Sequence, residues 1–160
     1  MDNAAIHRLT DADTLARAIG SAMFAQDAAS QGLGMQLKKI SPGYACVTMT
    51  VRHGMLNSHQ TCHGGFIFTL ADSAFAYACN SGNQNTVASG CTIDYLAPAR
   101  EGDHLQAEAV EQSRAGRLGV YDVTVSNQEG LRIALFRGKS YQIKGEVIGG
   151  LESRTRGDPA

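Results

Sequence analysis

The spacing of apolar positions changes along the chain, and each change predicts a different element. In residues 11–27, apolar side chains recur at the spacing of a short amphipathic helix, and an aspartate at its start can cap it. From residue 35 the spacing falls to two, which is typical of strands. We expect strands over residues 35–40 and 44–51, joined as a hairpin by the Ser-Pro-Gly turn between them.

Residues 63–81 are the most apolar stretch, and their pattern predicts a helix that is buried on almost every side. Its single charged residue is Asp72. The positions that are polar or lack a large side chain share one helix face, and they are Gly65, Thr69, Asp72 and Ala76. Two interpretations of Asp72 stay open: a hydrated carboxylate beside a gap in the covering, or a carboxylate held in a partly buried cleft.

Four further strand-like runs follow the apolar helix, over residues 86–96, 105–112, 119–127 and 132–143. Their alternation of apolar and polar residues predicts a sheet with one covered face. A curved, mostly antiparallel sheet wrapped round the apolar helix hides that helix most simply, so we expect an α+β fold. We expect one domain over residues 1–145 and a disordered tail over residues 146–160, which are polar and unpatterned.

The composition narrows the function classes. The 160 residues carry 14 basic and 15 acidic side chains and a net charge of −1, which argues against nucleic acid or an anionic membrane as the partner. No apolar run reaches membrane-spanning length, and the N-terminus lacks the positive start and apolar core of a secretion signal. The four cysteines form no CxxC pair, so we expect free thiols and a cytoplasmic protein.

The start of the apolar helix is a candidate anion site. His63, Gly64 and Gly65 place backbone N–H groups with little side-chain cover at the positive end of the helix dipole. A packing explanation is equally open, because glycines also allow another element to pass closely. The preceding loop, residues 52–62, is polar and too long to be only a connector, and it supplies Asn57 as an uncharged donor and acceptor.

The separation of Gly64 and Asp72 predicts an assembly. Eight residues of helix span about 12 Å, so the two groups cannot both lie about 3 Å from one reacting carbon within a single subunit. Two antiparallel copies of the helix across a two-fold axis bring Asp72 of one subunit opposite Gly64 of the other. If both groups act on one substrate, the protein is a homodimer with its sites at the interface.

Four runs of the sequence resemble one known family. They are MLNSHQTCHGGFIFTLADSAFAYACNS, VASGCTIDYLAPAREGD, GVYDVTVSNQEG and ALFRGKSY. Over about residues 57–143 they resemble the hotdog-fold acyl-CoA thioesterases of the phenylacetate-degradation (PaaI-type) branch. The resemblance implies a hotdog sheet round a long helix, dimers that commonly pair into tetramers, and hydrolysis of aryl-acetyl thioesters such as phenylacetyl-CoA and its hydroxylated derivatives. It implies no cofactor, because coenzyme A is part of the substrate.

The same resemblance implies roles for individual residues. Asp72 takes the place of the helix acid that acts as nucleophile or general base. The Gly64 amide takes the place of the group that polarises the thioester carbonyl. Asn57 corresponds to the loop asparagine that orients water or substrate, and His63 to the histidine just before that glycine.

One position departs from the pattern of some relatives. Ala88 stands where they place a water-orienting serine on the strand after the helix, although Ser89 and Thr92 are close in sequence. The choice between an activated water and an anhydride intermediate therefore stays open. We count Ser89 and Gly65 among the predicted substrate contacts.

Coenzyme A carries phosphates, and basic residues of the last strand are candidates to bind them. Arg137 and Lys139 face the same way, with Gly138 between them to let a ligand approach. The alternative is a charged edge strand that resists aggregation. Weaker candidates for the phosphates are Arg114, Arg117 and Lys144. The aromatic residues that either line an acyl pocket or pack in the core are Phe66, Phe68 and Tyr77.

Other functions remain open on the sequence alone. A metal site or a Cys–His nucleophile pair would draw on His53, His59, Cys62 and His63, but their spacing is irregular and we expect no metal. A non-catalytic acyl-CoA-binding protein would keep the phosphate contacts without needing Asp72. A hydratase or dehydratase of the same hotdog fold would act without releasing a thiol.

Overall fold

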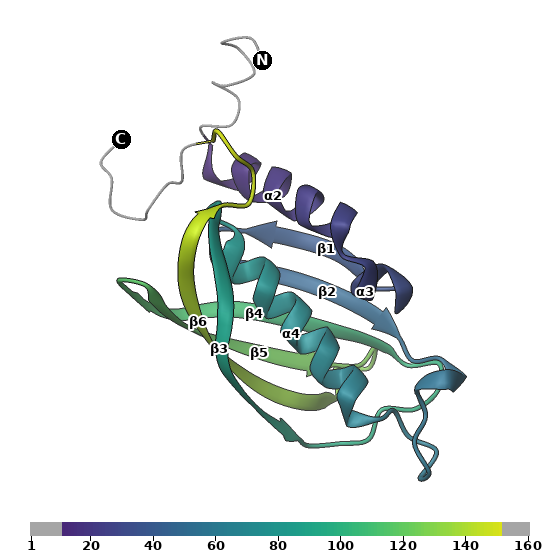
Figure 1. Ribbon diagram of the computed structural model, residues 1–160. Helices are drawn as coiled ribbons and strands as arrows, with labels where there is room; N and C mark the ends of the chain where they lie inside the picture. Colours follow the sequence, from purple (N-terminus) through teal and green to yellow (C-terminus); the bar gives the residue numbers. More distant parts are fainter. Residues whose placement is uncertain (1–10, 152–160) are drawn as a thin grey trace.

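A six-stranded antiparallel sheet curves round one long helix in the computed structural model, which describes residues 11–151 (Figure 1). The sheet order is β1-β2-β4-β5-β6-β3, so β1 and β3 are the edge strands. The strands are β1 (Gln36–Ser41), β2 (Tyr44–Thr50), β3 (Gln84–Tyr95), β4 (His104–Ala115), β5 (Leu118–Ser126) and β6 (Arg132–Glu146). The helices are α2 (Ala12–Gln26), α3 (Ala28–Gly32), α4 (Gly64–Asn80) and the 3-10 helix η1 (His53–Met55). The predicted architecture is confirmed.

Helix α4 lies in the core of the domain, as its composition predicts. Its side chains Leu70, Ala71, Ala74 and Phe75 are almost fully buried against the inner face of the sheet. Strand β6 approaches this helix closely at Gly138, where a Cβ would lie 2.8 Å from the ring of Phe75. Only glycine fits at this crossing, since any side chain would have to displace the buried ring.

The N-terminal helix stops at Gln26 and a second, short helix follows. Asp27 caps α3, because its carboxylate accepts a hydrogen bond from the Ser30 N–H at 3.0 Å. The same carboxylate accepts hydrogen bonds from the Ser30 hydroxyl at 2.6 Å and from the buried Tyr77 hydroxyl of α4 at 2.8 Å. Asp27 therefore joins the α2–α3 corner to the central helix.

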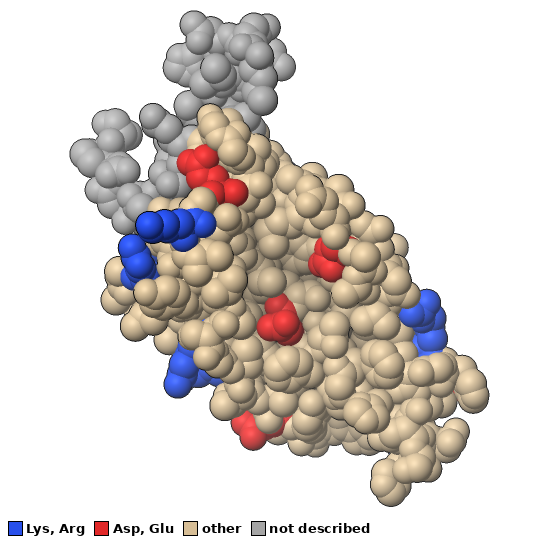
Figure 2. Space-filling model, in the orientation of Figure 1, with Lys and Arg blue, Asp and Glu red and all other residues tan. Residues whose placement is uncertain are grey.

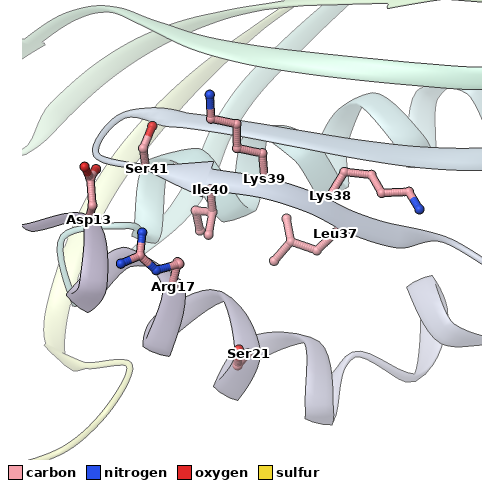
Figure 3. Close-up of a pocket in the computed structure, with 8 residues that line it drawn as sticks. All are labelled: Asp13, Arg17, Ser21, Leu37, Lys38, Lys39, Ile40 and Ser41. Atoms are coloured by element: carbon pink, nitrogen blue, oxygen red, sulfur yellow. The ribbon is translucent and has the colours of Figure 1, made fainter.

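Helix α2 covers the edge strand β1 at a β-bulge. The register shift between Leu37 and Lys39 allows Leu37 and Ile40 both to point toward α2 (Figure 3). Gly20 leaves room for them, because a Cβ there would lie 2.8 Å from Leu37 Cδ2. An open groove of about 360 Å³ lies beside this contact, and none of the predicted site residues lines it.

The residues that follow β6 make hydrogen bonds to Asn83 in the part of the predicted tail that the structure describes. Strand β6 continues to Glu146, and the buried side chain of Asn83 holds the segment that follows. Asn83 accepts the Ile148 N–H at 2.8 Å and donates to the carbonyl oxygens of Ile148 and Leu151 at 3.1 and 2.9 Å. Because Asn83 and Ile148 are 65 residues apart, no local sequence pattern predicts this contact. The rest of the predicted tail lies outside the described residues, and the division at residue 145 stays a prediction.

Two further expectations concern the state of the cysteines and the presence of membrane-spanning helices. All four cysteines are free thiols, as predicted: Cys46, Cys62, Cys79 and Cys91. Of the helices in residues 11–151, none combines the length and apolar character that crossing a membrane requires.

Candidate active site

Asp72 lies on the side of α4 that the sheet leaves uncovered. The predicted stripe is confirmed, because Gly65 is exposed and Thr69, Asp72 and Ala76 are only half-buried. The opposite side of the helix is in the core, at Ile67, Leu70, Ala71, Ala74 and Phe75. Within residues 11–151 the Asp72 carboxylate makes no hydrogen bond and no ion pair. Burial raises the pKa of this carboxyl group above its ordinary value, and no basic side chain counteracts the shift. The structure therefore favours the partly buried cleft over a freely hydrated surface group.

The start of α4 keeps one backbone donor available. His63 caps the helix, since its Nδ1 accepts a hydrogen bond from the Gly65 N–H at 2.9 Å. The Phe66 N–H donates to the His63 carbonyl oxygen at 3.0 Å. The Gly64 N–H has no acceptor among residues 11–151. An unpaired N–H at the positive end of a helix is suited to stabilise an oxyanion.

Tyr95 of β3 fixes the position of Gly64. Its hydroxyl donates to the Gly64 carbonyl oxygen at 2.9 Å, and its ring fills the space that a Cβ of Gly64 would need, with Cζ at 2.8 Å from that position. Packing against Tyr95 therefore explains why a glycine stands at position 64, in addition to the candidate chemical role of its N–H. No local sequence pattern indicates a role for Tyr95, because only the fold brings residue 95 to the start of α4.

Asn57 shapes the loop in front of the helix. Its Oδ1 accepts hydrogen bonds from the N–H groups of His59 and Thr61 at 2.9 and 3.2 Å. Gln60, between them, adopts a left-handed backbone with φ of 58°. The Asn57 Nδ2 group donates to no residue in the described chain. The side chain thus holds the loop through its oxygen and leaves its amide donor for a ligand.

One chain does not bring these groups together. Gly64 and Asp72 are separated by eight residues of the continuous helix α4, which is about 12 Å along its axis. His63 and Asn57 lie at the Gly64 end, because the His63 N–H donates to the Met55 carbonyl oxygen at 2.8 Å in the same loop. The candidate site is therefore divided into an amide end and an acid end.

Two thiols lie at the acid end. Cys91 of β3 pairs with Gly138 of β6, so it shares the inner face of the sheet that contacts Phe75. Burial, and then the negative charge of Asp72, raise the pKa of the Cys91 thiol. Burial, with a smaller effect of the Asp72 charge, also raises the pKa of the Cys79 thiol, which lies in the last turn of α4. Cys91 was not predicted as a site residue, because its position depends on the register of β3 and β6.

The predicted phosphate contacts of β6 face away from the helix. Gly138 lies on the inner face, so Arg137 and Lys139 lie on the outer face. Arg137 forms a bidentate ion pair with Asp122 of β5, with N···O distances of 2.6 and 2.8 Å. This partner holds the pKa of the Asp122 carboxyl below its ordinary value. The close packing of Gly138 on α4 explains this glycine without a ligand, and the phosphate roles of Arg137 and Lys139 stay predictions.

Other predicted contacts have structural partners. The Ser89 hydroxyl donates to the Lys139 carbonyl oxygen at 3.1 Å, at a β-bulge of the edge strand β3. Tyr77 donates its hydroxyl to Asp27 and is buried. Phe68 packs edge-on against Phe136, with ring centroids 5.4 Å apart. Of the two predicted roles, these contacts favour core packing over an acyl pocket for Tyr77 and Phe68.

The loop cysteine and histidines do not form a metal or nucleophile site. In the part of the chain that the structure describes, no three His, Cys, Asp or Glu side chains converge to hold a metal. Burial raises the pKa of the Cys62 thiol to about 11, so it stays protonated at neutral pH. A nucleophilic cysteine requires the opposite shift.

The face of the molecule that carries α4 bears few charges. Figure 2 shows acidic groups near the middle of this face, whereas the Lys and Arg side chains lie toward its margins. A surface of this kind is suited to pack against another protein surface, because few charges lose their water on contact.

Comparison with known proteins places this geometry in a family. The family described as "Thioesterase superfamily" matches residues 59–134. "Acyl-coenzyme A thioesterase PaaI" of Escherichia coli (strain K12) is 50% identical over 128 residues, which are 80% of this chain and 91% of that protein. The structure of the E. coli PaaI protein from the phenylacetic acid degradation operon has a TM-score of 0.84 at 47% identity, over 85% of this chain and 99% of that one.

A more distant structure carries a ligand. A Streptococcus mutans protein bound to acetyl CoA has a TM-score of 0.67 at 28% identity, over 70% of this chain and 90% of that one. Both structures match the curved sheet and central helix of this chain over most of its length. Since a half-identical relative is matched over nearly its whole length, this chain belongs to the hotdog-fold acyl-CoA thioesterases of the PaaI type.

Proposed function

We propose that this chain hydrolyses aromatic acyl-CoA thioesters, of the phenylacetyl or hydroxyphenylacetyl type, to the free acid and coenzyme A. The observation that carries the proposal is the half-buried Asp72 carboxylate, which has no partner in the described chain and a raised pKa. The aromatic acyl group is supported by the similarity to a protein from a phenylacetic acid degradation operon. The cytoplasm is the expected location, because the four thiols are free.

The reaction needs an acid residue and an oxyanion site, because a thioester carbonyl is electrophilic and a thiolate leaves readily. The Gly64 N–H donates a hydrogen bond to the carbonyl oxygen as negative charge develops on it. Asp72 either removes a proton from water, whose oxygen then attacks the carbonyl carbon, or attacks that carbon itself to give an anhydride that water opens. In both routes the C–S bond breaks and the thiolate takes up a proton. The Asn57 amide group orients the water or the substrate.

A homodimer completes each site. An antiparallel pair of α4 helices places Asp72 of one subunit opposite Gly64 of its partner, which removes the separation of about 12 Å within one chain. The lightly charged face over α4 supports such packing. Strand β3 supports it too, because it is an edge strand of twelve residues with Val87 and Tyr95 exposed, and the next residue, Leu96, is exposed as well. We propose a dimer of dimers as the full assembly.

The reaction is tested by following thiol release from a panel of short, long and aromatic acyl-CoA thioesters with a thiol-reactive dye. Phenylacetyl-CoA or a hydroxylated derivative should give the highest kcat/KM. Asp72→Ala should lose hydrolysis and retain binding of the thioester. Fastest turnover of long straight chains would refute the aromatic assignment, and an undiminished rate in Asp72→Ala would refute the role of this carboxylate. If the natural protein bound acyl-CoA thioesters but hydrolysed none of them, it would be an acyl-CoA-binding protein and not a thioesterase.

The shared site is tested by mixing subunits. Asp72→Ala and Asn57→Ala place their defects at opposite ends of the candidate site. A mixed dimer has one site with both defects and one with neither, so a mixture should recover activity that neither variant has alone. No recovery in dimers confirmed as mixed, for instance by two different affinity tags, would contradict a site built from two subunits.

A further inference from the structure

The hydroxyl group of Thr69 lies near Asp72 on the uncovered face of α4, and no step of the proposed reaction uses it. Thr69 is half-buried and precedes Asp72 by three residues, which is about 4.5 Å along the helix axis. Residues at this spacing are neighbours on a helix surface, with Cβ atoms about 5–6 Å apart. Helical side chains lean toward the N-terminus of their helix, so the Asp72 carboxylate leans toward Thr69. The two side chains therefore border the same part of the candidate site.

The Thr69 hydroxyl can act there only as an acceptor. Its proton is engaged, because Oγ1 donates a hydrogen bond to the Gly65 carbonyl oxygen at 2.8 Å. A hydroxyl oxygen has one proton to donate and two lone pairs that accept. Thr69 accordingly makes no hydrogen bond to Asp72 in the described chain. Its remaining hydrogen-bonding capacity consists of lone pairs.

Two acceptors placed in this way are suited to hold one water molecule. An ionised carboxylate also accepts only, and a water molecule has one proton for each of the two acceptors. When a water donates to both at ordinary hydrogen-bond lengths, the two acceptor oxygens lie about 4–5 Å apart. The lone pairs of that water then point away from the surface of α4. In the proposed dimer, this direction leads to a thioester carbonyl held at Gly64 of the partner subunit.

The other side chains near Asp72 are less suited to hold this water. Ala88 has no polar side-chain atom. The Ser89 hydroxyl donates to a carbonyl oxygen of β6 at 3.1 Å, and the Ser73 hydroxyl lies 3.2 Å from that of Ser30 in α3. Cys91 lies at the acid end of the site, but a thiol is a weak acceptor. Thr69 is therefore the side chain that best complements Asp72.

We infer that Thr69 positions the attacking water, with its Oγ1 accepting one proton of the water while Asp72 removes the other as general base. The inference rests on the proposed function and selects the water route from the two routes given there. As the water oxygen bonds to the carbonyl carbon, the carbonyl electron pair moves to the oxygen beside the Gly64 N–H of the partner subunit. This pair returns as the C–S bond breaks, and the leaving thiolate takes the proton from the Asp72 carboxyl group.

The test replaces the hydroxyl of Thr69 with a methyl group. Thr69→Val keeps the shape and the helix propensity of threonine and removes the acceptor. It should lower kcat for phenylacetyl-CoA by about 10- to 100-fold, because the water is no longer oriented, while KM changes by less than about twofold. Thr69→Ser keeps the hydroxyl and should retain kcat within about threefold. Thr69→Ala should show the same loss as Thr69→Val, and it replaces that variant if valine prevents folding.

A matched variant controls for the loss of a hydroxyl from α4. Ser73 is next to Asp72 in the sequence, but its hydroxyl contacts Ser30 of α3. Ser73→Ala should therefore leave kcat unchanged. A single turnover in water labelled with oxygen-18, with enzyme in excess, gives a second measurement on the natural protein. The label should enter the free acid, and mass spectrometry should find none in the peptide that carries Asp72.

Four results would overturn the inference. They are an unchanged kcat in Thr69→Val, an equal loss in Thr69→Ser, a rise in KM without a fall in kcat, and oxygen-18 in Asp72. The third would mean that Thr69 binds the substrate, and the fourth would mean that an anhydride forms.

Failure of the proposed function gives a different result. If the natural protein releases no thiol from any acyl-CoA, the hydrolysis proposal fails and the role of Thr69 falls with it. If the natural protein is active, Asp72→Ala is inactive and Thr69→Val is fully active, only the role of Thr69 is refuted.

Discussion

The Tyr95 hydroxyl donates a hydrogen bond to the Gly64 carbonyl oxygen at 2.9 Å, and the ring of the same residue fills the space that a Cβ of Gly64 would need. The candidate oxyanion donor is the N–H of that glycine. The edge strand β3 thus sets the position of the first turn of α4. A change at either residue should alter catalysis by moving a backbone group and not by removing a reactive side chain.

Gly64→Ala should lower kcat/KM by on the order of 10- to 100-fold, because the new Cβ meets the Tyr95 ring at 2.8 Å and displaces the donor. Unfolding by urea should show a loss of about 1–3 kcal/mol from the same overlap. In a Tyr95→Ala background, Gly64→Ala should cost much less in both measurements. Gly32→Ala, where the space is open, serves as the control. An equal cost of Gly64→Ala in both backgrounds would show that the ring is not the obstacle.

Asp72 should give the protein a characteristic dependence on pH. If its ionised form is the base or nucleophile, log kcat/KM should fall on the acid side with a midpoint above the ordinary Asp pKa, because burial raises the pKa of this group. Asp72→Asn should lower kcat by about 10²- to 10⁴-fold at neutral pH. A pH–rate profile of the natural protein with a midpoint at or below the ordinary Asp value would contradict the assignment.

The same carboxylate should reduce stability at neutral pH. A folded-state pKa above the unfolded value means that the folded protein binds more protons between the two values, so the free energy of unfolding decreases as pH rises through that window. Above the folded-state pKa, the destabilisation caused by burying the ionised Asp72 carboxylate reaches its full value. Asp72→Asn should therefore raise Tm at pH 7 and have little effect on Tm near pH 3. Thermal unfolding followed by circular dichroism at both pH values checks this, and a lower Tm at pH 7 would refute it.

Gly138→Ala should destabilise the protein by about 1–3 kcal/mol, because its Cβ would lie 2.8 Å from three atoms of the buried Phe75 ring. The additional substitution Phe75→Leu should reduce the cost of Gly138→Ala, which a double-mutant cycle in urea measures. Gly90→Ala is the matched control, since Gly90 lies opposite the neighbouring residue Lys139 and has open space around it. A neutral Gly138→Ala would leave ligand approach as the reason for this glycine.

Local periodicity was sufficient to predict the architecture. The apolar helix, its stripe with Asp72 and the alternating strands are all confirmed, because burial imposes a repeat of 3.6 or 2 residues on the sequence itself. The short helix α3 was not predicted, since Asp27 can equally end one helix or cap the next. The hydrogen bonds of residues 148 and 151 were not predicted either, because their partner is the distant Asn83.

The candidate site was predictable only where it depends on helix geometry. The distance from Gly64 to Asp72 follows from the rise of a helix, so the division of the site was foreseen from the sequence. Contacts across strands depend on register, which no local pattern specifies. Tyr95 beside Gly64 and Cys91 near Asp72 were missed for this reason.

The N-cap of α3 should be more important for stability than that of α2. Burial alone would raise the pKa of Asp27, but hydrogen bonds from Ser30 and Tyr77 outweigh it and hold the pKa below its ordinary value. Asp27→Asn should cost about 1–2 kcal/mol at pH 7, and Tyr77→Phe about 1 kcal/mol, in urea unfolding. Asp11 caps α2 in an exposed position, so Asp11→Asn should have a smaller effect.

The dependence of the free energy of unfolding on pH distinguishes the charged hydrogen bonds of Asp27 from simple packing. A depressed folded-state pKa stabilises the protein above the unfolded pKa of about 3.8, and this contribution is lost as pH falls through the folded-state value. The stability difference between the natural protein and Asp27→Asn should therefore be constant from pH 7 to pH 5 and shrink below pH 4. Since the hydrogen bonds join α3 to the last turn of α4, a difference that persists unchanged at pH 3 would mean that the charge of Asp27 does not hold this corner.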